Sequence, residues 1–223
     1  MIVNFQGFGH FVDGLNNQDA AIETDRMVLV LDGCSGARFA EVGTRLFAQL
    51  FARKEDYDKL ENFELNMKET FEEILNKIRG HYTSDEDFEK NFIMDNLLFT
   101  TIALFDCGEK YVVKMFGDGY IITQNVYGNI SYMRFSYGKY PPYFAYKYCK
   151  GMGLENREFK TYELKKSSFP RVFIGTDGIQ PVVKGEVDGF DDIIKRNDKQ
   201  IQSVIRSNRQ KFYDDITIGR FGN

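Results

Sequence analysis

Aspartates stand at the ends of several apolar runs, where a strand would reach the surface of a domain. Asp32 ends the run 27–31, and the other aspartates placed in this way are Asp19, Asp118, Asp177, Asp214 and Asp215. Because the ends of adjacent strands converge, these carboxylates can share one site. Two carboxylates about 4 Å apart repel by about 4 kcal/mol at an effective dielectric constant near 20. Such a cluster therefore requires a cation, and all-oxygen ligation with open water positions suits Mg²⁺ or Mn²⁺.

The alternative for each aspartate is an ordinary turn. Asp-Gly is common turn chemistry, and the pair begins at residues 13, 32, 118, 177 and 188. A single pair therefore indicates only a turn. What favours a shared site is the repetition of Asp-Gly after apolar strands, together with Asp214-Asp215 directly before another strand.

The hydrophobic pattern predicts the elements that must position these side chains. Strands are predicted over residues 2–8, 20–23, 27–31, 98–105, 111–116, 120–124, 130–135, 159–164, 171–174 and 216–221. The strands at 20–23 and 27–31 form a hairpin, and the four from 98 to 135 form a meander. Helices are predicted over residues 38–53, 63–82, from 84 onward, 189–197 and 199–210. Paired helices and antiparallel strand runs indicate an α+β fold with segregated layers.

Two local predictions accompany this outline. Ser35 caps the first long helix, whose apolar face is formed by Phe39, Val42, Leu46, Phe47 and Leu50. Residues 137–156 lack a clear period, and their aromatic-rich part at 137–148 is predicted to be a loop that covers a sheet, with partner docking as the alternative. Gly7, Gly9 and Gly14 predict an irregular loop after the first strand.

Composition narrows the class of protein. The 223 residues and a formal charge of −4 are those of an ordinary globular chain, with no basic footprint for nucleic acid. No apolar run approaches the roughly 20 residues that span a bilayer, and the N-terminus lacks the pattern of a signal peptide. Three scattered cysteines favour a reducing compartment. We expect a cytoplasmic, monomeric single domain over residues 1–223 that binds neither membrane nor nucleic acid.

Six short motifs occur in an order that resembles the metal-dependent, type 2C protein phosphatases. They are Asn17-Gln18-Asp19-Ala20, Leu31-Asp32-Gly33-Cys34-Ser35-Gly36, Thr100-Thr101, Phe116-Gly117-Asp118-Gly119-Tyr120, Gly175-Thr176-Asp177-Gly178-Ile179 and Asp214-Asp215-Ile216-Thr217. Their spacing matches over residues 16–218, nearly the whole chain. The resemblance implies a four-layer α-β-β-α sandwich of two antiparallel sheets flanked by helices, with a two-metal site at one end.

The resemblance also implies roles for individual residues. Asp32 would bridge two Mg²⁺ or Mn²⁺ ions, and the Gly33 carbonyl would complete the first ion's ligands. Asp177 and Asp214 would hold the second ion, Asp19 would order metal-bound water, and Asp118 would hold a third, weaker metal. Two cations lower the pKa of a bridging water toward about 7 and screen the phosphate that it attacks. The implied substrate is a protein phosphorylated on serine or threonine.

The chain departs from the family pattern at five positions. Gly14 stands where many members carry the arginine that grips phosphate, and Pro181 stands where a further metal-binding aspartate is common. Cys34 replaces a histidine, Ser35 a glycine and Gly119 a serine. The intact Asp32, Asp177 and Asp214 favour an active phosphatase. The missing arginine favours the alternative, a catalytically inactive phosphatase-like domain that binds a partner or metal.

The sequence lacks residues that other catalytic classes require. A cysteine phosphatase needs an arginine six residues after Cys34, and Ala40 is there instead; the thiol is predicted to be small and buried. A haloacid-dehalogenase-like enzyme would need an aspartate at residue 34. A Ser–His–Asp triad is disfavoured, because His10 and His81 are the only histidines and both are predicted to lie in loops or on the surface. Neither Gly-Lys-Ser nor Gly-Lys-Thr occurs, which excludes a P-loop.

A divalent metal is predicted to stabilise the fold, because the carboxylates repel one another without it. Binding to the folded state alone contributes about 2.7 kcal/mol at a hundredfold excess over the dissociation constant. Thermal melting with Mn²⁺, compared with melting in EDTA, measures this directly. A Tm that does not change on addition of Mn²⁺ up to millimolar concentration would contradict a formed metal site.

Overall fold

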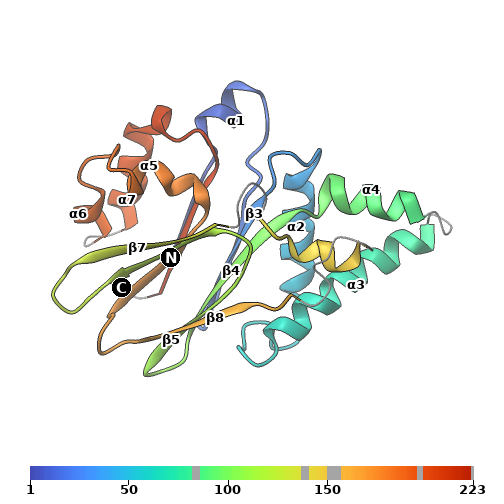
Figure 1. Cartoon of the computed structure of the whole chain (residues 1–223), viewed down its shortest axis with the longest axis horizontal. Coiled ribbons are helices and arrows are strands. Elements are labelled where there is room, and N and C mark those ends of the chain that lie inside the picture. The colour runs from blue at the N-terminus through green and yellow to red at the C-terminus, as the bar shows by residue number, and fades with distance from the viewer. Residues whose placement is uncertain (82–85, 137–140, 150–156, 195–197, 222–223) are drawn as a thin grey trace.

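The computed structural model describes residues 1–81, 86–136, 141–149, 157–194 and 198–221. Two antiparallel sheets pack face to face, and helices cover the outer face of each sheet (Figure 1). One sheet has the strand order β1-β10-β9-β6-β7 and the other β2-β3-β4-β5-β8. The predicted α+β architecture, a four-layer α-β-β-α sandwich, is confirmed.

The strands of the first sheet, in spatial order, are β1 (Ile2–Phe5), β10 (Ile216–Arg220), β9 (Arg171–Gly175), β6 (Gly119–Gln124) and β7 (Ile130–Phe135). Those of the second are β2 (Ala20–Glu23), β3 (Met27–Gly33), β4 (Phe99–Asp106), β5 (Lys110–Phe116) and β8 (Lys160–Lys165). The α-helices are α1 (Phe8–Val12), α2 (Ala40–Phe51), α3 (Phe63–His81), α4 (Glu86–Asn96), α5 (Gln180–Val183), α6 (Phe190–Ile194) and α7 (Asp198–Ser207). The 3₁₀ turns in the described residues are η1 (Phe144–Tyr148), η2 (Asp177–Ile179) and η3 (Arg209–Lys211).

The unbroken apolar run of β3 reflects burial on both faces of its sheet. Met27, Leu29 and Leu31 belong to the core beneath α2 and α3. Val28 and Val30 belong to the core between the two sheets. Successive side chains of a strand point to opposite faces, and each fully buried apolar side chain contributes roughly 1.5–3 kcal/mol. The run therefore anchors two layers at once and fixes where Asp32 emerges.

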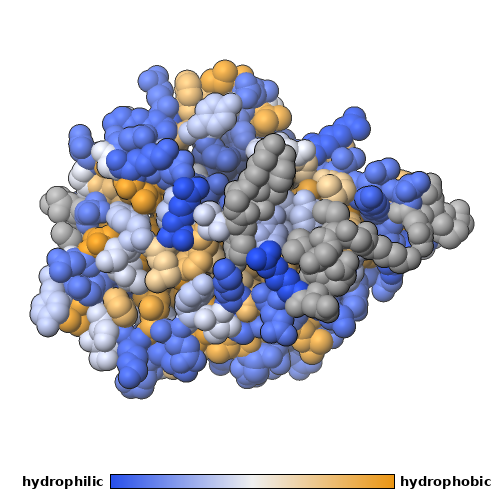
Figure 2. All heavy atoms as spheres, viewed as in Figure 1, coloured by the Kyte–Doolittle hydropathy of each residue, from blue (hydrophilic) through white to orange (hydrophobic). Residues whose placement is uncertain are grey.

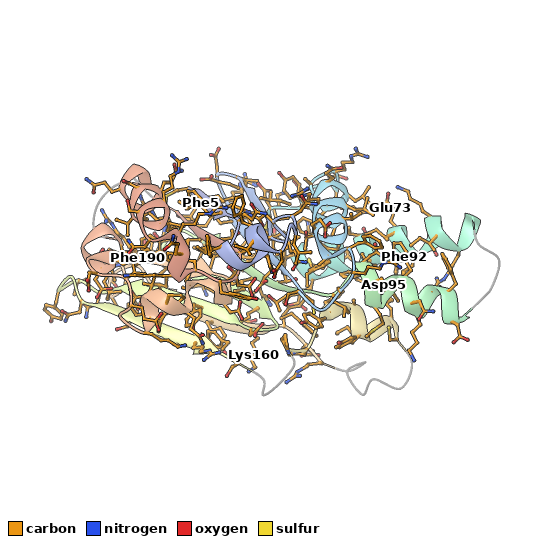
Figure 3. The ribbon with its side chains drawn as sticks, turned by 90° about the horizontal axis from the view of Figure 1, so that it is seen from above. Phe5, Glu73, Phe92, Asp95, Lys160 and Phe190 are labelled. Carbon is orange, nitrogen blue, oxygen red and sulfur yellow. The ribbon has the colours of Figure 1, made fainter. Side chains whose placement is uncertain are left out.

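A third core lies under α5, α6 and α7, on the outer face of the other sheet. Phe190 and Ile205 from these helices pack with Phe173 and Ile218 from β9 and β10. Seen from above, Phe190 lies in the helical layer on one side of the sheets and Phe92 in the layer on the other (Figure 3). Helices thus pack on the outer face of each sheet.

The predicted four-stranded meander is wrong, although its four strands exist. β4 pairs with β5 in one sheet, whereas β6 pairs with β7 in the other, and β5 and β6 are not paired. The chain crosses between sheets at Gly117-Asp118-Gly119. Gly117 and Gly119 have φ of 111° and 132°, a region that disfavours side chains. The change of sheet places Asp118 at the end of the sandwich.

The first long helix differs from its predicted start and face. It begins at Ala40 after Phe39, with no side-chain cap from Ser35. Phe47 and Leu50 are buried as predicted and Leu46 is half-buried, whereas Phe39 and Val42 are 41% and 51% exposed. The helix instead packs closely on α4 at Gly43. A Cβ on Gly43 would stand 1.5 Å from the Asn96 carbonyl oxygen, so this contact requires glycine.

Several smaller elements also differ from the sequence pattern. α1 occupies the stretch for which the pattern predicts an irregular loop, and α5 lies where the pattern predicts no element. The predicted loop over 137–156 contains η1, where Tyr143, Phe144 and Ala145 are buried against the second sheet, so the covering role is confirmed for the described part. Residues 82–85, 137–140, 150–156, 195–197 and 222–223, which include some predicted helix ends, lie outside the described residues. None of the described helices is both long and apolar enough to cross a membrane.

We predict that Gly43→Ala destabilises the protein by about 1–3 kcal/mol, because the new methyl overlaps the α4 backbone and forces the helices apart. Gly80→Ala in α3 is the matched control, since a Cβ there meets nothing within 4 Å. It should stabilise by up to about 1 kcal/mol through helix propensity alone. Urea unfolding of both variants measures the difference; a Gly43→Ala protein as stable as the control would contradict this packing.

Candidate metal centre

The second sheet delivers two carboxylates side by side. β2 and β3 pair with Ala20 opposite Leu31, so the next residues, Asp19 and Asp32, come together at the end of the hairpin. Asp19 is only 4% exposed, and its Oδ2 accepts a 2.7 Å hydrogen bond from the Thr217 hydroxyl on the other sheet. Its Oδ1 is buried without a hydrogen-bond donor among the described residues. That free oxygen is available to a cation.

The first sheet delivers Asp177 and Asp214 to the same end. Asp177 opens η2 just after β9, and Asp214 comes two residues before β10. The Thr176 amide donates to the Thr217 carbonyl at 3.0 Å, which ties the two strand ends together. A Cβ at Gly178 would lie 1.8 Å from the Asp215 carbonyl oxygen, so this close approach requires glycine.

The electrostatics show that all five predicted carboxylates share one environment. Burial is the largest cause of a raised pKa for Asp19, Asp32, Asp118, Asp177 and Asp214. The charges of neighbouring aspartates raise it further, and for Asp214 that neighbour is Asp215. For Asp177 the pKa reaches about 7. Without a cation, the cluster therefore retains protons that isolated aspartates would lose at neutral pH.

The donor set fits hard divalent cations. Carboxylate oxygens predominate, the Gly33 carbonyl lies beside Asp32 at the end of β3, and the free Asp19 Oδ1 adds an unsatisfied buried acceptor. Mg²⁺ and Mn²⁺ prefer such ligands. A cation would offset the repulsion that raises these pKa values, and would satisfy the orphaned oxygen.

His10 is the residue whose place the sequence pattern gets wrong. The pattern predicts a loop or surface position, but His10 is 4% exposed and belongs to α1. Its Nδ1 lies 2.9 Å from Asp215 Oδ2, and its Nε2 lies 3.5 Å from Asp214 Oδ1. These three side chains form a group with metal-binding geometry among the described residues. His81 ends α3.

Asp215 braces the segments around the cluster. It is 2% exposed, and its two oxygens accept hydrogen bonds from the Gly7 amide at 2.8 Å and the Gln18 amide at 2.6 Å. One carboxylate therefore joins α1, the stretch before Asp19 and the start of β10. The signal in the sequence is the pair Asp214-Asp215 before a strand. The sequence does not tell which of the two would bind a metal and which holds the neighbouring backbone.

Arg134 on β7 is a second residue that sequence reasoning missed. β6 and β7 pair with Tyr120 opposite Arg134, two residues from Asp118. Its positive charge lowers the pKa of Asp118 and Asp177 against the larger effect of burial. A cationic group thus lies beside the carboxylates, although position 14 lacks one.

The remaining predicted positions are less involved. Gly14 has φ of 71°, and a Cβ added there would meet nothing within 4 Å, so it lies in open space. Pro181 lies in the first turn of α5. Cys34 is a free, half-buried thiol, whereas a buried one is predicted, and its amide donates to the Leu98 carbonyl at 2.9 Å.

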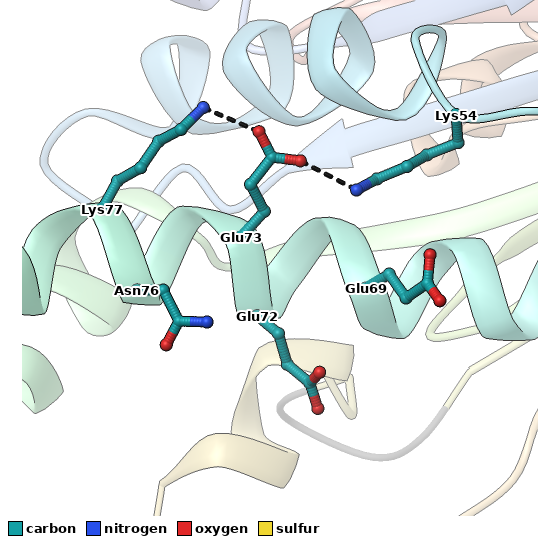
Figure 4. A pocket seen from close by; sticks show the side chains of 6 residues that line it. All are labelled: Lys54, Glu69, Glu72, Glu73, Asn76 and Lys77. Atoms are coloured by element: carbon teal, nitrogen blue, oxygen red, sulfur yellow. Dashed lines mark hydrogen bonds and ion pairs between the residues drawn. The ribbon is translucent and has the colours of Figure 1, made fainter.

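A separate pocket on the outer helical layer carries no comparable chemistry. It is lined by Lys54, Lys77, Asn76 and three glutamates of α3, Glu69, Glu72 and Glu73 (Figure 4). Glu73 accepts from Lys54 at 2.8 Å and from Lys77 at 2.7 Å. These hydrogen bonds lower its pKa to about 2. The carboxylate is already paired, as in an ordinary solvated ion-pair network.

Comparisons with known proteins agree with this fold. A family model described as "Protein phosphatase 2C" matches residues 6–211. By sequence, no curated protein matches the chain. Among solved structures, PppA, "a key regulatory component of T6SS in Pseudomonas aeruginosa", superposes with a TM-score of 0.66 at 15% identity over 99% of this chain and 96% of its own.

Two further solved structures share the fold. The catalytic domain of the serine/threonine phosphatase PstP, in complex with two manganese ions, has a TM-score of 0.65 at 14% identity, covering 98% of this chain and 94% of its own. The serine/threonine phosphatase Stp1 from Staphylococcus aureus has a TM-score of 0.64 at 12% identity, covering 98% and 92%. At these identities the likeness shows the fold.

We predict that the stability of the metal-free protein falls as pH rises from about 4 to 7. Asp177 has a pKa near 7 when folded but about 3.8 when unfolded, so the folded state holds a proton that the unfolded state has lost. Each pH unit in this window then costs up to about 1.4 kcal/mol for that group. Urea unfolding in EDTA should show a smaller loss for Asp177→Asn, whereas Asp188→Asn, outside the cluster, should follow wild type. Equal slopes in all three proteins would contradict the shift.

Proposed function

The chain belongs to the protein phosphatase 2C family, and we propose that it is a metal-dependent phosphatase that acts on phosphoserine and phosphothreonine in proteins. The observation that carries this proposal is the convergence of five carboxylates from both sheets, each with a raised pKa. Perturbed groups of this kind mark functional sites. The solved relatives support the substrate class, because PstP and Stp1 are serine/threonine phosphatases.

We assign the ligands from their places in the fold. Asp32 would contact both of two Mg²⁺ or Mn²⁺ ions, with the Gly33 carbonyl on the first, and Asp177 and Asp214 would hold the second. Asp118 would serve a third, weaker ion at the crossover between sheets. Bound there, the cations would supply hydroxide at neutral pH and screen the charge of the phosphate.

The chain's own groups would set the geometry of the reaction. Asp19 is held by the Thr217 hydroxyl through Oδ2, which leaves Oδ1 to orient the bound cations and their water. His10 and Asp215 fix the backbone before β10 and so the direction of Asp214. Arg134 would attract the phosphate toward the cluster by its charge.

We also propose that residues 1–223 form one phosphatase domain. β1 and β10, from the two ends of the sequence, pair antiparallel with Val3 opposite Ile218. The N-terminal amine donates to the Arg220 carbonyl at 2.9 Å. Removing either end would therefore expose the strand edge of the other.

Gly14 favours a second candidate, a phosphatase-like domain that binds metal or a partner without turnover. The position lies in open space and offers no cation to a phosphate group. If phosphate is held by metals and Arg134 alone, the Michaelis constant for small esters rises more than turnover falls. The two candidates make opposite predictions for wild-type protein.

We predict that wild type hydrolyses p-nitrophenyl phosphate and a phosphothreonine peptide with added Mn²⁺ and not in EDTA. Asp32→Asn should lower kcat/KM at least about a hundredfold and weaken Mn²⁺ binding together, since even groups that only orient metal ligands are worth about 10–100-fold. Asp188→Asn is the control, because it changes an exposed Asp-Gly aspartate outside the cluster.

Turnover and calorimetric Mn²⁺ titration should be measured on the same samples. Full activity in excess EDTA would overturn the metal-dependent mechanism. Wild type that binds Mn²⁺ but hydrolyses neither substrate would establish the binding domain instead.

A further inference from the structure

A groove runs beside the metal centre, between the β1–α1 segment and the α7–η3 segment. We call it the arginine groove; it is lined by Phe5, Gln6, Ile205, Arg206, Arg209, Phe212 and Ile216. Its floor is apolar, since Ile205, Phe212 and Ile216 are each 1% exposed. The two arginines provide the charged part of its lining. A groove of this composition suits a segment with both apolar and anionic groups.

The guanidinium groups of the groove are held in place but are not neutralised. Arg206 lies 5.5 Å from the ring centre of Phe5, and Arg209 lies 4.3 Å from that of Phe11. Cation–π contacts of this kind fix the direction of the charge. Within the described part of the chain, neither arginine forms an ion pair with a carboxylate. Two free guanidiniums in one groove favour carboxylate or phosphate groups.

An exposed apolar surface adjoins the groove. We call it the α1 ridge; it consists of Phe11, Val12, Leu15 and Tyr213, which are 55%, 63%, 43% and 73% exposed. Figure 2 shows apolar side chains gathered over α1 at the top of the molecule. The Tyr213 ring packs so closely on Gly9 that a Cβ there would lie 2.8 Å away. Aromatic residues beside arginine are the usual composition of a protein-binding surface.

Both surfaces include residues next to the proposed ligand Asp214 along the chain. Tyr213 directly precedes Asp214, and η3 with Arg209 ends two residues before Tyr213. His10 of α1 is buried, unlike the ridge residues, and lies 3.5 Å from Asp214. A peptide whose phosphorylated residue occupies the cluster would therefore pass over the ridge toward the arginines.

We propose that the α1 ridge and the arginine groove dock the part of a phosphoprotein substrate that flanks its phosphorylated residue, and that they select flanks rich in acidic and apolar residues. This inference rests on the proposed function. Charge complementarity carries it, because unpaired arginines in a chain of net charge −4 mark a local preference for anions. An anionic membrane is disfavoured as occupant, since the overall charge repels it and the arginines line a concave groove.

The test compares three Mn²⁺-dependent substrates: p-nitrophenyl phosphate, a short phosphothreonine peptide, and the same peptide extended on either side by about eight residues rich in Glu, Phe and Leu. Such an extension spans up to roughly 26 Å. For wild type, kcat/KM should be about tenfold higher for one of the extended peptides than for the short peptide, because its KM is lower. A tenfold difference corresponds to one well-made set of contacts. The double variant Arg206→Glu/Arg209→Glu should lose this preference and keep its activity on p-nitrophenyl phosphate within about twofold.

A control of equal charge change is Arg26→Glu/Lys68→Glu, whose side chains are exposed and lie outside the groove and the ridge. It should keep the preference for the extended peptide. A catalytically active wild type without that preference, or a groove variant that retains it, would overturn the proposal. Arginine-dependent binding to phosphatidylserine vesicles without any peptide preference would also overturn it, in favour of a membrane surface.

Peptide binding, measured by fluorescence anisotropy on the same proteins, separates docking from catalysis. Arginine-dependent binding of the extended peptide without turnover would uphold the docking surface and refute the phosphatase activity. Turnover without arginine-dependent binding would do the reverse.

Discussion

The mutual repulsion of carboxylates at one end of the sandwich is the constraint on which the rest of the structure depends. Asp32 and Asp19 are brought together by one sheet, and Asp177 and Asp214 by the other. Burial and neighbouring charge both oppose ionisation there. Only a rigid framework keeps such groups close, and the three apolar cores supply it from outside and between the sheets. The fold is thereby weakened at the point where a bound cation would stabilise it.

The contacts around the cluster show how this arrangement is held. Asp215 accepts two backbone amides and lies against His10, so a residue next to a proposed ligand serves as a brace. The Thr217 hydroxyl joins the sheets through Asp19. The same α1 that buries His10 exposes part of the α1 ridge. The carboxylate cluster thus lies close to the α1 ridge and the arginine groove. This combination suits a peptide that carries a phosphorylated residue with acidic neighbours.

Much of this could be predicted from the sequence, because strands buried on both faces leave continuous apolar runs and their ends are marked by Asp and Gly. The β2–β3 hairpin and the clustering of Asp32 with Asp177 follow from such local patterns. The crossover at Gly117-Asp118-Gly119 could not be predicted, since a turn within a sheet and a passage between sheets share the same residues. The burial of His10 escapes prediction for a related reason. It depends on contacts with residues 214 and 215, which lie far along the chain and which no local period reports.

Anomalous diffraction at the manganese edge, from crystals grown with Mn²⁺, tests the central claim most directly. The carboxylates are expected to surround a pair of anomalous peaks, with Asp32 in contact with both and Asp177 and Asp214 in contact with the second. Peaks at other surface carboxylates only, such as Glu73 on α3, or no peak at the end of the sandwich, would contradict the account.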